Sequence, residues 1–289
     1  MPEPTPSPGL ADEARRHDPD RWLCALFAVA ERRDEVMALL LLNHELARIP
    51  DVVSQPLAGM IRYQWWRDSI EGAADGQPRA HPVVEALSRA LRAGRLDGGS
   101  LLAMVDAREH DLERLAPEDP AALEAYAEAT AGAVQAGTAR LLGADAAGIA
   151  AARNVGTAWG LVGIVRATAG MAQQGRSLLP ASLTAAVGIE PNAMLAQESR
   201  AAVAGVLRGI GELAGSILDR PRAPLPRNAV AAVLPALLAC NYLRRIAAAN
   251  FDPLVAAALT RPALAPLRLW WAYRRAPAAE AATRTGSGR

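Results

Sequence analysis

The apolar stretches of the chain are built from strong helix formers, and the alternation of β-branched and polar residues that marks a strand is rare. Asp18 followed by Pro19 predicts a helix start, because aspartate caps a helix and proline fits its first position. Pro50 and Gly143 are predicted helix ends. The pattern predicts helices over residues 19–30, 33–49, 53–72, 82–94, 99–114, 121–142, 147–174, 180–187, 192–218, 228–250, 253–260 and 263–275.

No break in composition and no internal repeat divides these stretches. The sequence therefore predicts one all-α domain over residues 18–275, with disordered tails at 1–17 and 276–289. The longest apolar run, Ala229–Cys240, has about a dozen residues and contains Pro235, against the roughly 18–20 residues that cross a bilayer. We expect it to be a buried core helix, and we expect no membrane-spanning segment.

Charge and cysteine content narrow the class of protein. The 31 basic residues, all arginine, nearly balance the 30 acidic ones, so the formal net charge is +1. A near-neutral chain has no overall field to hold nucleic acid, and we expect no nucleic-acid partner. Cys24 and Cys240 lie far apart in apolar stretches and form neither a metal knuckle nor a disulfide framework.

Generic catalytic motifs do not occur: there is no GxGxxG, P-loop, HExxH or GxSxG sequence. The densest ionisable cluster is Asp106–Glu113, in which Asp106 and His110 share a helix face. This cluster is typical of a solvated charged face, and it makes only a weak metal site.

Three other stretches carry more information. In Leu39–Asp51 an apolar helix ends in polar groups, with His44 and Arg48 four residues apart on one face. Met60–Glu71 places two adjacent tryptophans beside charged residues, and Trp159–Pro180 is a glycine-rich helix that ends in Gly175-Arg176.

Taken in order, such stretches resemble the squalene/phytoene synthase family over almost the whole chain. The matching segments are Asp18–Arg33, Asn43–Val53, Gln64–Glu71, Asp111-Leu112, Tyr126–Val134, Gly163–Pro180 and Asn241–Ile246. The resemblance implies a single isoprenoid-synthase-type helical bundle around a central cavity. Active members of the family join two prenyl diphosphates head to head, with Mg²⁺ held by aspartate-rich motifs on two facing helices.

This chain departs from the family at both motifs. The first, C-R-x-x-D-D-x-x-D, aligns with residues 43–51, where Ala47 and Arg48 replace two carboxylates and Asp51 remains. The second, R-D-x-x-x-D-x-x-x-G-R, aligns with residues 166–176, where Ala167 and Met171 replace both carboxylates. A Mg²⁺ cluster would have almost no ligands there, since this ion prefers carboxylate oxygen.

The altered motifs are more similar to a non-catalytic branch of the family, which includes a mitochondrial assembly factor for respiratory complex I. That similarity implies a scaffold or assembly factor that needs no cofactor. It implies respiratory-complex subunits or another protein as partners, and a cytoplasmic location with peripheral contact to the inner membrane.

Two alternatives stay open. The first is an enzyme, a prenyltransferase acting on prenyl diphosphates, whose Mg²⁺ is held at a relocated site by Asp106, Glu109 and Asp111. The second is a metal-free module that binds an isoprenoid or lipid, because arginine grips phosphate bidentately.

The candidate ligand-binding residues come from the two altered motifs. They are His44, Arg48 and Asp51 in the first motif and Arg166, Gly175 and Arg176 in the second. The simpler alternative is that the arginines form ion pairs with Glu45, Asp51 or Asp68.

Two tryptophan pairs, Trp65-Trp66 and Trp270-Trp271, add a surface hypothesis. Neighbours on a helix point about 100° apart, so one member of each pair is expected in the core and the other near the surface. Trp66 and Trp271 are the candidates for membrane or partner contact, and core packing is the alternative.

Overall fold

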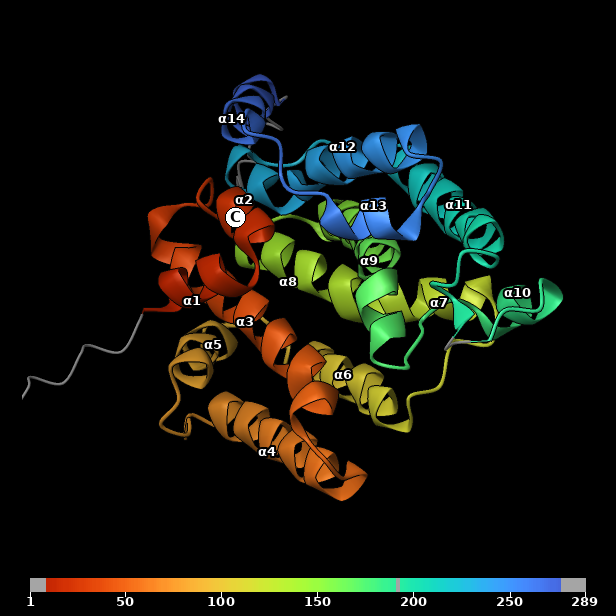
Figure 1. Cartoon of the computed structure of the whole chain (residues 1–289). Coiled ribbons are helices and arrows are strands. Elements are labelled where there is room, and N and C mark those ends of the chain that lie inside the picture. Colours follow the sequence, from red (N-terminus) through yellow and green to blue (C-terminus); the bar gives the residue numbers. More distant parts are fainter. Residues whose placement is uncertain (1–8, 191–192, 277–289) are drawn as a thin grey trace, which may run out of the picture.

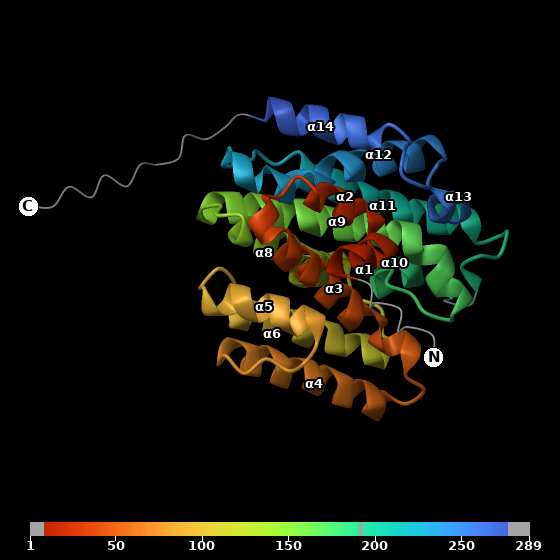
Figure 2. The ribbon, with the colours of Figure 1, turned by 90° about the vertical axis from the view of Figure 1, so that its left-hand side faces the viewer.

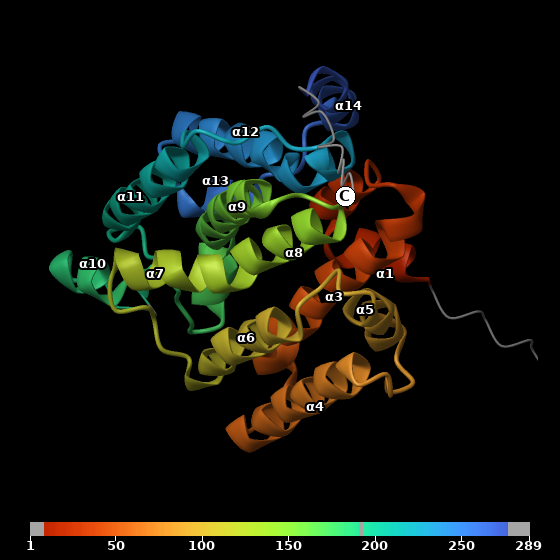
Figure 3. The same ribbon diagram turned by 180° about the vertical axis from the view of Figure 1, so that it is seen from behind.

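The computed structural model describes residues 9–190 and 193–276, which form an all-helical bundle without strands. In chain order the elements are α1 (Leu10–His17), α2 (Pro19–Ala25), α3 (Ala30–Val52), α4 (Pro56–Ala74), α5 (Pro82–Arg92), α6 (Gly98–Glu109), η1 (His110–Glu113), α7 (Pro120–Ala127), η2 (Glu128–Gly132), α8 (Ala133–Leu141), α9 (Ala146–Gln173), α10 (Ala181–Ala186), α11 (Arg200–Leu218), η4 (Arg227–Val233), α12 (Pro235–Ala248), α13 (Pro253–Ala258) and α14 (Ala265–Arg275). The predicted all-α class is confirmed. Figures 1 and 3 show α9 near the middle of the molecule, with α4 at one edge and α14 at the opposite edge.

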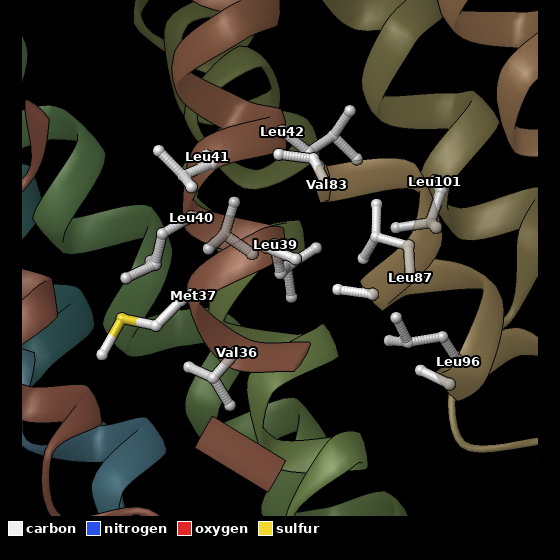
Figure 4. Packing of buried hydrophobic residues seen from close by; sticks show 14 of the residues in the cluster. Val36, Met37, Leu39, Leu40, Leu41, Leu42, Val83, Leu87, Leu96 and Leu101 are labelled. Atoms are coloured by element: carbon white, nitrogen blue, oxygen red, sulfur yellow. The ribbon is translucent and has the colours of Figure 1, made fainter. Parts of the chain in front are cut away.

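One part of the core surrounds α3. Residues 36–42 of this helix are all buried, so α3 is apolar on every side for about two turns. Helices α1, α5 and α8 cover its faces. Figure 4 shows side chains of this run packed with those of Val83, Leu87, Leu96 and Leu101, from α5, α6 and the loop between them.

The other part of the core surrounds α9, which packs against α8, α11, α12 and α13. In the view of Figure 2 most long helices run side by side, and α14 forms the outermost layer beyond α12. The chain therefore folds around two buried helices, and these two carry the altered motifs.

The first helix corrects the prediction of a disordered tail over residues 1–17. Acidic residues in the first turn of α1 and basic residues in its last turn suit the helix dipole. Ala14 is fully buried, and α1 packs along α3. The folded domain therefore includes Leu10–His17. The rest of the predicted tails, residues 1–8 and 277–289, lies outside the described residues.

The prediction that Pro50 ends a helix is also wrong, because α3 continues to Val52. Proline has no N–H to donate to the carbonyl four residues earlier, which belongs to Leu46. The hydroxyl of Tyr63, from α4, donates to that carbonyl at 3.1 Å instead. Both residues are fully buried. A neighbouring helix thus supplies the hydrogen bond that proline removes.

Other predicted bounds shift for local reasons. The helix expected over 19–30 ends at Ala25, because Phe27 and Ala28 bond to carbonyls only three residues back. The helix expected over 99–114 stops at Glu109, and a 3₁₀ turn follows until Arg114 adopts a left-handed conformation with φ 56°. The helix expected from 192 begins at Arg200.

A π-turn, η2, separates α7 from α8 where one continuous helix was predicted. It lies against α9 at Gly156 and Gly160. A Cβ at Gly156 would sit 2.4 Å from the carbonyl oxygen of Ala131, and one at Gly160 would sit 3.0 Å from its Cβ. Glycine is required at Gly156 for this close approach.

Among the described residues, three helical stretches are long and apolar enough to cross a membrane by length and composition: Ala146–Gln173, Arg200–Leu218 and Arg227–Ala248. A search for one unbroken apolar run does not find these candidates, because alanine-rich helices are apolar over long distances without such a run. Here 61%, 44% and 61% of the respective windows are buried inside the bundle.

Candidate functional site

A cavity of about 550 Å³ lies between the C-terminal halves of α3 and α9. Ala47 and Asp51 of α3 line it, as do Ala167 and Met171 of α9. A second hollow of about 200 Å³ shares several wall residues with it, Ala167 and Met171 included, and extends inward to Trp159. The two hollows are therefore parts of one central cavity, and the two altered motifs face each other across it.

Small residues form the α9 wall. Gly163, Ala167, Gly170 and Met171 follow helical spacing along one face. A Cβ at Gly163 or Gly170 would meet no other described atom within 4 Å. A glycine-rich helix often indicates close packing against a neighbour, but at these two positions the missing side chains leave open space.

Two of the predicted site residues lie outside this cavity. Arg48 pairs with Glu45 at 3.2 Å in a separate groove between α3 and α4. His44 stacks on His17 of α1, with ring centroids 4.0 Å apart. Burial, and then the neighbouring His17, lower the pKa of His44. The structure therefore does not bring His44 and Arg48 together with the second motif.

Arg176, in contrast, connects both walls. It follows Gly175, whose φ of +67° closes α9: the amide of Gly175 donates to Ala172 at 3.0 Å, and that of Arg176 to Met171 at 2.9 Å. These two bonds form a Schellman motif, in which glycine suits the left-handed residue. The Arg176 guanidinium then pairs with Asp51 at 2.7 Å.

A second polar group consists of Arg108, Asp111 and Tyr126. All three line the larger hollow, and Arg108 and Tyr126 also line the smaller one. The Arg108 guanidinium donates to the Tyr126 oxygen at 2.6 Å and to Asp111 at 3.2 Å, and the Tyr126 hydroxyl donates to Asp111 at 3.0 Å. Burial raises the pKa of Tyr126, so its hydroxyl stays protonated. Sequence reasoning missed Arg108 and Tyr126, although the first lies in the ionisable cluster and the second in a segment of the family resemblance.

The Arg166 side chain is held by contacts with α12 and with the residue that follows α13. Its guanidinium lies over the Tyr242 ring at 4.0 Å and donates to the carbonyl of Leu259 at 2.9 Å. Tyr242 in turn donates to the buried Asp20 at 2.8 Å, and burial together with this hydrogen bond raises the pKa of Tyr242 to about 12. Arg166 still lines the cavity from this position.

The charges of the cavity wall are mainly positive. Its described lining contains four arginines, Arg108, Arg114, Arg166 and Arg176, and two carboxylates, Asp51 and Asp111. Each carboxylate is already paired with an arginine. The Nε atoms of Arg108, Arg166 and Arg176 are buried and have no hydrogen-bond partner among the described residues.

These residues do not fit the Mg²⁺ cluster that the family resemblance implies. The residues proposed for a relocated metal site are divided, because Asp106 and Glu109 pair with Arg67 of α4 and only Asp111 faces the cavity. Over the described part of the chain, no group of three or more histidine, cysteine, aspartate or glutamate side chains is arranged to hold a metal.

Only the first tryptophan pair separates into a core and a surface side. Trp270 and Trp271 are 45% and 47% exposed, so the expectation of one core member is wrong for the second pair. Trp66 is 5% exposed and packs edge-to-face with Trp65, so it belongs to the core and the surface contact predicted for it is wrong. Trp271 is exposed on α14. Figure 1 shows this helix at the edge of the molecule opposite α4.

An all-helical bundle with a cavity between two facing motif helices is the isoprenoid-synthase fold. Solved structures agree: a dehydrosqualene synthase in complex with ligand superimposes with a TM-score of 0.77 at 14% identity, covering 92% of this chain and 94% of that one. The squalene synthase HpnC from Alicyclobacillus acidocaldarius gives a TM-score of 0.67 at 14% identity, covering 84% and 94%. At this identity the similarity establishes the fold alone.

Sequence comparison defines the family and the branch. The squalene/phytoene synthase family model matches residues 14–271, and the chain belongs to this family. It is 30% identical over 260 residues to "NADH dehydrogenase (ubiquinone) complex I, assembly factor 6" of Bos taurus and of Homo sapiens, covering 89% of this chain and 78% of each relative. The resemblance to the family and to its assembly-factor branch is confirmed.

Proposed function

We propose that this protein is a non-catalytic member of the family that assists the assembly of an NADH dehydrogenase of the complex I type. One observation carries the proposal: three of the motif positions that face the cavity are Ala47, Ala167 and Met171, and the remaining carboxylate, Asp51, is paired with Arg176. The names of the relatives at about 30% identity supply the process.

The chemical argument concerns the leaving group. Departure of a diphosphate requires its charge to be neutralised, and a bound metal ion supplies that most effectively. The carboxylates of this cavity are already paired with arginines, so a metal would have to displace a guanidinium from each one. The prenyltransferase alternative would need Asp106 and Glu109 beside Asp111, whereas both pair with Arg67.

The test is deletion of the gene in its own host, with native gels and NADH-dependent quinone reduction as readouts. We expect the assembled NADH dehydrogenase to fall, and the wild-type chain and its Asp51→Asn variant both to restore it. Asp51 is the surviving motif carboxylate, so full restoration by this variant would separate assembly from metal chemistry.

The purified protein supplies the second arm. With farnesyl or geranylgeranyl diphosphate we expect diphosphate release at the buffer rate, with and without Mg²⁺. Release that depends on Mg²⁺ and disappears in Asp111→Asn would establish the relocated metal site and overturn the proposal. Normal levels of assembled NADH dehydrogenase in the deletion strain would overturn it independently.

One observation favours a second function, a metal-free site for an isoprenoid or lipid phosphate. Arginines outnumber carboxylates in the cavity wall, and three of them have a buried Nε without a partner. Arginine binds phosphate oxygens through paired N–H groups, and such bonds strengthen away from water.

Binding of farnesyl diphosphate in the presence of a chelator tests this function. Arg166→Gln and Arg176→Gln should each weaken binding at least tenfold, which corresponds to about 1.4 kcal/mol. Arg48→Gln is the matched control, because Arg48 belongs to the same motif region but lies outside the cavity. Equal losses in all three variants, or no binding by the wild type, would refute the second function.

A further inference from the structure

The C-terminal quarter of the chain is strongly basic, although the whole protein is nearly neutral. Residues 220–275 contain nine arginines and a single carboxylate, Asp252. The whole chain has 31 basic and 30 acidic residues, so the remainder carries a net negative charge. Asp252 pairs with Arg200 of α11 at 2.8 Å, and it therefore does not neutralise the basic segment. Arg220 and Arg261 do pair with carboxylates outside the segment, Glu124 and Asp20. Of the other seven arginines, five belong to α12 and α14, at one end of the molecule.

Helices α12 and α14 form the outer surface of that end, as Figures 1 and 2 show. A shallow groove of about 770 Å³ runs between them. Leu237 of α12, Leu264 directly before α14, and Leu267 and Trp271 of α14 line it, and they are 41%, 60%, 52% and 47% exposed. On α14 only Ala265 and Leu269 are buried, so most of this helix faces away from the core.

Arginines surround these apolar side chains. Arg244 and Arg268 line the groove, and the guanidinium groups of Arg274 and Arg275 lie 5.6 and 4.6 Å from the ring centroids of Trp270 and Trp271. Within the described residues none of the four arginines makes a salt bridge to a carboxylate. We name this surface, made of α12 residues 237–248 and α14 with Leu264, the α12–α14 face.

We propose that the α12–α14 face docks on an anionic phospholipid bilayer. Exposed leucine and tryptophan side chains reach the boundary between headgroups and acyl chains, where tryptophan is favoured because it has both an apolar ring and an N–H. Arginines beside them extend to the lipid phosphates and keep their apolar stems against the hydrocarbon. Charge complementarity selects the lipid, since an anionic surface attracts a face with unpaired guanidinium groups and no carboxylate.

This docking differs from membrane insertion and from ligand binding in the cavity. The three apolar helical stretches stay packed in the bundle, and only side chains already exposed on the α12–α14 face contact lipid. The central cavity shares no lining residue with the face. The proposal is therefore independent of the proposed assembly function.

Vesicle flotation of the full-length chain is the direct test. Vesicles of phosphatidylcholine with phosphatidylglycerol should carry the protein at low salt, and pure phosphatidylcholine vesicles should carry at least tenfold less. Raising the salt concentration should release it, because interactions with surface charge are screened. Each arginine at an anionic surface contributes about fivefold in partitioning, so Arg268→Glu with Arg275→Glu should abolish flotation.

Matched variants separate this face from general basic character. Arg89→Glu with Arg92→Glu changes two exposed arginines of α5, far from the face, and should leave flotation unchanged. Leu267→Ala with Trp271→Ala removes apolar contact without changing charge and should reduce flotation at least fivefold. Unfolding midpoints within 2 °C of the wild type would show that each variant folds.

Several results would overturn the proposal. These are equal flotation with neutral vesicles, an equal loss in the α5 control, and retention of flotation in the Arg268/Arg275 variant. Failure of the folded wild-type protein to float with anionic vesicles would do so as well. If wild-type protein that does not float bound a soluble acidic protein through the same arginines, the α12–α14 face would be a binding surface for a protein partner and not for a bilayer.

Discussion

Removal of one hydroxyl group, by Tyr63→Phe, should destabilise the helix that forms one wall of the cavity. Pro50 lies inside α3 and cannot bond to the Leu46 carbonyl, and the Tyr63 hydroxyl replaces that bond at 3.1 Å. Burial raises the pKa of Tyr63, so the hydroxyl is protonated and remains a donor at every pH at which the protein is handled. The phenylalanine variant leaves a buried carbonyl without a partner.

The magnitude follows from the cost of an unpaired buried acceptor. Such a group costs about 1–3 kcal/mol. Leu46 is fully buried, so we take the middle of that range and expect a loss of about 2 kcal/mol. Urea unfolding followed by circular dichroism measures it as a lower midpoint at constant slope. Tyr273→Phe is the control, because no hydrogen bond of its hydroxyl is present among the described residues; it should change stability by less than about 0.5 kcal/mol.

A double-mutant cycle tests the cause. Pro50→Ala restores an N–H that reaches the Leu46 carbonyl along the helix, so Tyr63→Phe in that background should cost about 1 kcal/mol less than in the wild type. The explanation would be refuted by an equal cost of Tyr63→Phe in both backgrounds, since the hydroxyl would then not be replacing the bond that proline removes.

Three further predictions concern other parts of the fold. Gly156→Ala should lower the free energy of unfolding by about 2 kcal/mol, because its Cβ would lie 2.4 Å from a carbonyl oxygen. Gly163→Ala in the same helix meets open space and should raise the free energy of unfolding by about 0.5–1 kcal/mol. Urea unfolding that ranks the two variants in the opposite order would contradict the assignment of the two faces of α9. The pKa of His44 is lowered in the folded state, so its contribution to the free energy of unfolding is present above pH 6.5 and is lost as the pH falls below that unfolded-state value. The difference in free energy of unfolding between pH 7 and pH 5.5 should therefore be smaller in His44→Gln than in the wild type. An unchanged difference would contradict this prediction. Burial raises the pKa of the Cys24 thiol, so a thiol reagent should modify the partly exposed Cys240 first and Cys24 only on unfolding; equal rates in the native protein would show that Cys24 is accessible.

Local patterns predicted that helices exist and where most of them lie, but not how one helix compensates for another. Proline is a reliable local signal, yet α3 passes through Pro50 because Tyr63, on the next helix, supplies the missing donor. The same limit applies to the α9 glycines. Periodicity places Gly156 and Gly163 on one helix, but only the packing of η2 against it shows which glycine is needed for contact and which leaves space.

The candidate site was predictable in outline and not in its polar detail. Alignment with the family motifs placed Ala47 and Asp51 opposite Ala167 and Met171, and these residues do face one cavity. Helical spacing put His44 and Arg48 on a shared face but could not tell which side of a helix buried all round faces the cavity. Arg108 was missed for another reason.

The partners of Arg108 are brought to it by the fold. Tyr126 belongs to a different helix, and the ionisable cluster around Arg108 resembled an ordinary solvated surface. That interpretation holds for Asp106 and Glu109, which pair with Arg67, but not for Asp111, which turns inward with the 3₁₀ turn η1. A change of helix geometry at Glu109 thus divides one charged segment between two environments, and no residue type in the segment signals that division.

The altered motifs make the net charge of the cavity wall positive instead of removing charge from it. The second family motif pairs carboxylates with Arg166 and Arg176, and this chain keeps both arginines where Ala167 and Met171 replace the acids. Asp51 and Asp111 offset only part of the four cavity arginines, so the wall is cationic without any metal. In an active family member a metal ion would join the two walls, whereas here the Arg176–Asp51 pair does so directly. Among the described lining residues the only carboxylates are Asp51 and Asp111, and both are paired with arginines, so the wall is held together by ion pairs where the family motifs would place a metal.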